Sequence, residues 1–183
     1  MERKMQKTRS TTIIAVLHNG KAAIAGDGQV SVEDTIIKRT AMKIRTINDG
    51  KILAGYAGTA GDALALFEIF EKKLGEYSND LQRASVELVK EWRTDKALQT
   101  LEALIAVTDG KHVLLISGNG DVVEPDDGIV AIGSGGVYAL AAARAIIWAN
   151  PKLTADKIAR RALEIAADIC VYTNNHISVE TIK

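Results

Sequence analysis

Apolar positions along the chain recur with two periods, one typical of strands and one typical of helices. Four runs of strand length come first, at residues 12–18, 21–26, 42–47 and 51–57. Asn19-Gly20 separates the first two runs, and this pair is favoured in two-residue hairpin turns. We therefore expect two hairpins at the start of the fold, with the beginning of the first strand close to the end of the second.

The middle and the end of the chain alternate between helical and strand patterns. Helical stripes are expected from Asp62 to Leu74, after a capping Asp80, over 138–149, and from Thr154 to about residue 172. Further strands are expected at 101–108, 112–117, 122–123, 128–132 and 177–182. No helix separates successive strands within either block, so the sheets should be mainly antiparallel and each needs a helical cover. The pattern predicts an α+β fold in which two stacked sheets lie between two helix layers.

Composition narrows the class of protein. The chain has 183 residues, most simply one domain, and its 23 Lys and Arg balance its 23 Asp and Glu. This balance gives no overall field to recruit nucleic acid or an anionic membrane. The single cysteine, Cys170, excludes an internal disulfide and fits a reducing cytoplasm. The apolar runs are also too short and too often interrupted by charge for a transmembrane helix.

The dipeptide Thr11-Thr12 opens the first apolar run and follows ten polar, largely basic residues. If residues 1–10 are a leader that is removed, Thr11 carries a hydroxyl nucleophile and a free α-amine on one residue. An α-amine has a reference pKa of roughly 7.7 to 8.0, so part of it can accept a proton near neutral pH. The alternative is that the dipeptide only starts a strand, where β-branched residues are common.

Four further positions could support such a nucleophile. Asp27 follows a strand between two glycines, and Lys43, if it points inward, would need a carboxylate partner such as Asp27. The amide of Gly55 could stabilise an oxyanion, and Ser134 could hydrogen-bond the terminal amine. Each has an ordinary alternative: a turn aspartate, an exposed lysine, or glycine turns that only cap helices.

Other catalytic and binding motifs fail on inspection. The glycine turn at 133–136 lacks the third glycine of a dinucleotide fingerprint, where Tyr138 stands, and no Gly-Lys-Ser/Thr phosphate loop occurs. The three histidines, His18, His112 and His176, have no metal-ligand spacing. A threonine nucleophile is therefore the strongest catalytic interpretation of the residues themselves.

Several motifs together resemble the HslV (ClpQ) family of bacterial peptidases, which is related to proteasome β-subunits. They are Thr11-Thr12-Ile13, Gly26-Asp27-Gly28-Gln29, Lys43, and residues 54–58, 91–95, 117–121, 132–136 and 168–174. They follow the family's order from Thr11 to the C-terminus, and Asp27 lies midway between Thr11 and Lys43 as the family pattern requires. The agreement of many motifs in order and spacing favours the resemblance over chance.

The resemblance implies an N-terminal nucleophile hydrolase with an αββα sandwich, a cytoplasmic threonine endopeptidase. It implies two stacked six-membered rings, and an HslU-type AAA+ ATPase that unfolds protein substrates and threads them in, with no nucleotide on this subunit. Thr11 would be nucleophile and base, Asp27 and Lys43 would tune it, Gly55 would supply the oxyanion amide, and Ser134 would support the amine.

The resemblance also implies a structural sodium ion. Its ligands would be backbone carbonyls, at positions that match Ala167, Cys170 and Thr173. Because main-chain oxygens are the ligands, the side chains at these positions need not be polar.

The first ten residues depart from the family pattern. The leader ends in Ser10, where proteasome subunits usually have glycine. While residues 1–10 stay attached, Thr11 has no free amine, so the uncut form should be inactive. Cleavage after Arg9 would instead expose Ser10, and Met5 is an alternative start. A non-catalytic or zymogen ring subunit of the same fold is the main alternative function, and a phosphate or nucleotide binder is a weaker one.

Overall fold

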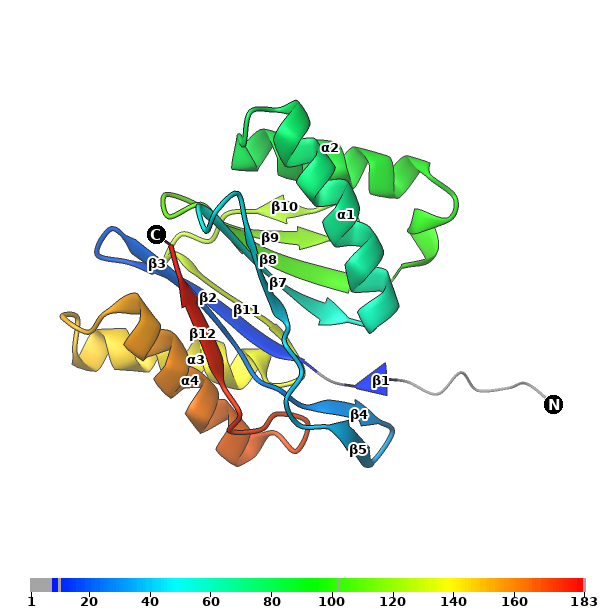
Figure 1. Ribbon diagram of the computed structural model, residues 1–183. Coiled ribbons are helices and arrows are strands. Elements are labelled where there is room, and N and C mark those ends of the chain that lie inside the picture. Colours follow the sequence, from blue (N-terminus) through cyan, green and yellow to red (C-terminus); the bar gives the residue numbers. More distant parts are fainter. Residues whose placement is uncertain (1–7, 10, 102, 183) are drawn as a thin grey trace.

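Two antiparallel sheets stacked face to face lie between two pairs of helices (Figure 1). The computed structural model describes residues 8–9, 11–101 and 103–182. Helices α1 (Ala60–Glu76) and α2 (Leu81–Thr94) cover the outer face of one sheet. Helices α3 (Gly136–Ala149) and α4 (Ala155–Ile169) cover the outer face of the other. The predicted four-layer α+β sandwich is confirmed.

The sheet under α3 and α4 holds the first hairpin. Its strand order is β11 (Ile129–Gly133), β2 (Thr12–His18), β3 (Lys21–Gly26) and β12 (Ser178–Thr181). Asn19 and Gly20 have φ values of 51° and 71°, so the turn is of the kind predicted. β2 is central and buried on both faces: Ile13 packs between the sheets, whereas Ile14 packs under the helices. Every pairing in this sheet is antiparallel.

The other sheet has the order β10 (Val122–Val123), β9 (Val113–Ser117), β8 (Ala103–Thr108), β7 (Ile52–Gly58) and β6 (Ile44–Ile47). A short 3₁₀ helix, η1 (Leu98–Thr100), precedes β8. Asp80 caps α2 as predicted, because its carboxylate accepts a hydrogen bond from the Arg83 amide at 2.9 Å. The stripes of α1 and α2 bury Phe70 and Trp92 against this sheet.

The two C-terminal helices pack closely on each other. Alanines on α3, such as Ala139 and Ala143, are fully buried and join the core shared with α4. α4 ends at Ile169 rather than near residue 172, because Cys170 leaves helical geometry with φ −93° and ψ 115°. Among the described residues no helix is both long enough and apolar enough to span a membrane.

A small third sheet joins β1 (Thr8–Arg9), β4 (Val30–Val32) and β5 (Thr35–Lys38). The sequence pattern did not predict it, since every residue of β5 is exposed and no apolar face marks the strand. β1 belongs to the expected leader and pairs antiparallel with β4. The rest of that leader, including Met5 and Ser10, lies outside the described residues.

Candidate active site

Thr11 is buried at the amino end of β2, held by the glycine turn that follows β11. Its side chain and backbone are only 3% exposed, and its carbonyl oxygen accepts a hydrogen bond from the Ser134 amide at 3.0 Å. A Cβ at Gly133 would lie 1.8 Å from that same oxygen, and Gly133 has a φ of 87°. Only glycine can make this close approach, so the turn fixes the position of Thr11.

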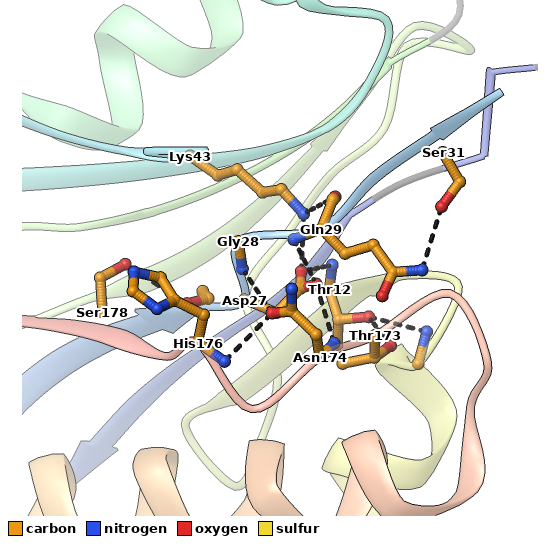
Figure 2. Close-up of polar contacts among 12 residues, drawn as sticks. Thr12, Asp27, Gly28, Gln29, Ser31, Lys43, Thr173, Asn174, His176 and Ser178 are labelled. Carbon is orange, nitrogen blue, oxygen red and sulfur yellow. Dashed lines mark hydrogen bonds and ion pairs between the residues drawn. The ribbon is translucent and has the colours of Figure 1, made fainter. Parts of the chain in front are cut away.

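The residue after it, Thr12, is anchored through both its backbone and its side chain (Figure 2). Its amide donates to Asp27 Oδ1 at 2.8 Å, and its carbonyl accepts from the Asp27 amide at 3.1 Å. Its hydroxyl accepts from the Gly135 amide at 2.9 Å and lies 2.7 Å from the Thr173 hydroxyl. The peptide that leads out of Thr11 therefore has one fixed orientation.

Asp27 organises the backbone around Thr11. The residue is fully buried, and each carboxylate oxygen accepts two hydrogen bonds. Oδ1 accepts from Thr12 N and from Lys43 Nζ at 2.7 Å. Oδ2 accepts from Gln29 N at 2.9 Å and from Asn174 N at 3.2 Å. These four bonds compensate the loss of hydration of a buried charge.

Lys43 lies just before β6 and points inward, as the sequence analysis required for its partnership with Asp27. The residue is 1% exposed, and its ammonium also donates to the Gln29 carbonyl oxygen at 2.6 Å. Burial lowers the pKa of Lys43 from its ordinary value, although the neighbouring Asp27 carboxylate acts in the opposite direction. The site thus holds one buried cation beside the start of β2.

Gly55 and Ser134 lie near Thr11 in different ways. Gly55 is in β7, and a Cβ there would come within 2.7 Å of the Ile13 side chain, two residues after Thr11. Ser134 is exposed and touches Thr11 through its backbone amide. The oxyanion role of the Gly55 amide and the contact between Ser134 and the terminal amine stay predictions.

The expected sodium ligands gather at the carboxyl end of α4. Ala167 is in the last turn of the helix, Cys170 follows it, and the Thr173 amide donates to the Cys170 carbonyl at 3.0 Å. Carbonyls in a last helical turn lack partners within the helix and carry its negative pole, which suits a hard cation. The described residues contain no cluster of acidic, histidine and cysteine side chains that could bind a metal. The sodium ion and its three carbonyl ligands stay predictions.

Sequence reasoning did not assign roles to Gln29 or Asn174, although both stand in the motifs of the resemblance. The Gln29 side-chain Nε2 donates to Ser31 Oγ at 3.0 Å and to the Val171 carbonyl oxygen at 2.9 Å. Asn174 bonds to Asp27 through its backbone and to Gly28 through its side chain. An asparagine shortly after a helix end is usually interpreted as a turn residue, so spacing alone gave no signal.

The pair of Lys43 and Asp27 predicts a stability effect. Lys43→Met leaves the Asp27 carboxylate buried without its cation, and breaking a buried pair costs about 3–5 kcal/mol. We expect that loss in the free energy of unfolding by urea denaturation at neutral pH. Lys72→Met is the matched control, because the Lys72 side chain is 69% exposed and its ion pair with Glu76 spans 3.8 Å. Equal stability of the two variants would contradict a buried charge pair.

Comparison with known proteins finds a matching family and close sequence relatives. A family model described as "Proteasome subunit" matches residues 7–182. The ATP-dependent protease subunit HslV of Geobacillus sp. (strain WCH70) is 58% identical over 178 residues, covering 96% of this chain and 99% of that protein. The protein of the same name from Bacillus cereus (strain B4264) is 56% identical over 178 residues, with the same coverage.

Solved structures agree with the sequence relatives. The crystal structure of eukaryotic HslV from Trypanosoma brucei superposes with a TM-score of 0.89 at 48% identity, covering 94% of this chain and 99% of that one. The Thiobacillus denitrificans BPH in complex with epoxomicin has a TM-score of 0.73 at 22% identity, covering 94% and 98% of the two chains, and supports the fold alone.

Proposed function

We propose that this chain is a threonine peptidase subunit of an ATP-dependent protein-degrading complex, because it belongs to the proteasome-subunit family and to its HslV group. The observation that carries the proposal is the buried network of Thr12, Asp27 and Lys43 directly behind Thr11. A non-catalytic ring subunit would have no need to bury a lysine next to that position. Thr11 acts as the nucleophile once its amine is free.

The chemistry follows from the groups around Thr11. The neutral α-amine takes the proton of the Thr11 hydroxyl as Oγ1 attacks the carbonyl carbon of a peptide bond. The Lys43 ammonium favours the neutral form of a nearby amine. The amide of Gly55 donates to the oxyanion. The C–N bond then breaks, the leaving amine takes the proton, and water hydrolyses the ester to regenerate Thr11.

The partners follow the same family argument. We propose that the complex contains two stacked hexameric rings of this chain and an HslU-type AAA+ ATPase, which delivers unfolded protein substrates and binds the nucleotide. Large apolar side chains around α3 and the end of α4 support contacts between copies: Trp148 is 88% exposed and Val171 78%. The reducing cytoplasm suits the single cysteine.

We propose sodium as the structural cation. The backbone carbonyls of Ala167, Cys170 and Thr173 would hold it, and it would brace the loop after α4. Thr173 belongs to this loop, and its hydroxyl lies against the Thr12 hydroxyl. The cation would therefore stabilise the segment that supports the nucleophile.

Peptide hydrolysis tests the proposed function. A ubiquitin fusion, cleaved to leave Thr11 as the first residue, is assayed with a fluorogenic peptide in the presence of the ATPase and ATP. We expect hydrolysis, whereas a folded, ring-forming protein without it would favour a non-catalytic subunit.

Calorimetric titration of the isolated protein with ATP tests the nucleotide-binding alternative. It should give no binding isotherm, and a clear isotherm would favour the nucleotide binder.

A further inference from the structure

The half-buried Asn174 side chain joins the two segments that carry Asp27 and Lys43, and Figure 2 shows its contacts with Gly28 and His176. Its Oδ1 accepts from the Gly28 amide at 3.1 Å and from the His176 amide at 3.1 Å. Its Nδ2 donates to the Arg39 carbonyl oxygen at 3.0 Å. Gly28 directly follows Asp27, and the segment from Arg39 leads into Lys43.

The three contacts determine how the amide is oriented. Two backbone N–H groups need an acceptor on one side, and one carbonyl needs a donor on the other. If the Asn174 side-chain oxygen and nitrogen exchanged places, the NH2 group would face the Gly28 and His176 N–H groups. The oxygen would then face the Arg39 carbonyl oxygen. An asparagine at position 174 therefore satisfies a polar pattern that aspartate, leucine or alanine cannot satisfy in full.

The two segments that Asn174 joins also touch each other directly. A Cβ at Gly28 would lie 2.3 Å from the Arg39 carbonyl oxygen, and the Ala41 amide donates to the Gly28 carbonyl at 2.9 Å. The Asn174 backbone amide meanwhile donates to Asp27 Oδ2. One residue thus fixes the Asp27 carboxylate, the peptide after it and the segment that leads to Lys43.

We propose that Asn174 is a positioning residue of the catalytic site, which sets the relative placement of Asp27 and Lys43 behind Thr11. The inference rests on the proposed peptidase function. Asn174 lies behind Asp27 and acts through Asp27 and Lys43, so its loss changes the chemical step and not the affinity for peptide. Misplacing a catalytic group by about 1 Å can cost about a hundredfold in rate. A half-buried bridge that water can partly replace should cost about tenfold.

Steady-state kinetics of the complete complex with the ATPase test the proposal. For Asn174→Ala we expect kcat to fall about tenfold with KM within about twofold of wild type, and the covalent labelling of Thr11 by a peptide vinyl sulfone to slow equally. Asn174→Asp keeps both acceptor contacts but loses the donor to Arg39, so its kcat should also fall. The neighbouring Asn175 is exposed, and Asn175→Ala and Asn175→Asp are matched controls with unchanged kcat.

The outcomes are separable. An unchanged kcat in Asn174→Ala, or a rise in KM alone, would overturn the positioning role while the wild-type activity upholds the peptidase function. If Asn174→Ala does not assemble, the isosteric Asn174→Asp decides, and wild-type kcat in that variant overturns the proposal. If the wild-type complex itself is inactive, the proposed function fails first.

Discussion

Thr11→Ala, in a chain that begins at residue 11, is expected to lower peptide hydrolysis by at least about a thousandfold. The variant loses the only hydroxyl that the terminal amine can activate within its own residue, while the buried network behind it stays intact. It should therefore keep the fold, together with the rings and the ATPase binding that we propose for the wild type. Fluorogenic peptide assays with the ATPase and ATP measure the loss.

Thr11→Ser is the matched control for this prediction. Serine keeps the hydroxyl and the amine but lacks the β-branch that restricts χ1, so a measurable part of the activity should remain. Hydrolysis by Thr11→Ala at the wild-type rate would contradict a threonine nucleophile. Equal inactivity of the serine variant would indicate that the hydroxyl alone is insufficient at this position.

The leader has a comparably large expected effect. A chain that keeps residues 1–10 should be as inactive as Thr11→Ala, because its Thr11 nitrogen is an amide and cannot accept the proton. In this form β1 pairs with β4, and Thr11 has a φ of 151°, which β-branched residues rarely adopt. Intact mass establishes which residue is first, and the same peptide assay then gives the activity of that species.

A chain that begins at Ser10 tests whether a terminal hydroxyl and amine are sufficient when their spacing from Asp27 and Lys43 is wrong. It has a hydroxyl and a free amine on its first residue, but Asp27 and Lys43 are one residue too far along to serve it. We expect its activity to be far below that of the chain beginning at Thr11. A full-length mass together with full activity would contradict the need for a free Thr11 amine.

Much of the fold could be predicted from the sequence because its strands and helices bury regular faces. The hairpin at Asn19-Gly20 and the cap at Asp80 each have a local chemical cause. The small third sheet has none, since β5 is exposed and β1 depends on β4 for its pairing. Strands of two to four residues are too short to leave a periodic trace in the sequence.

The charged pair of the candidate site was predictable from the sequence, but the contacts between its side chains and distant backbone groups were not. Asp27 and Lys43 pair because a buried lysine needs a carboxylate, an argument that spacing and burial could supply. Asn174 and Gln29 act through backbone carbonyls and amides of segments far away in the sequence. Which backbone groups need a partner depends on the folded loops, so residue type alone could not reveal these contacts.

The Ile13 side chain makes the nucleophile sensitive to how the two sheets sit on each other. It fills the space that a Cβ would take at Gly26 in the same sheet and at Gly55 in the opposite sheet, since such Cβ atoms would lie 2.6 Å and 2.7 Å from it. Close-packed interiors transmit displacement rather than absorbing it. Any displacement of one sheet over the other would therefore move Ile13, and with it the start of β2.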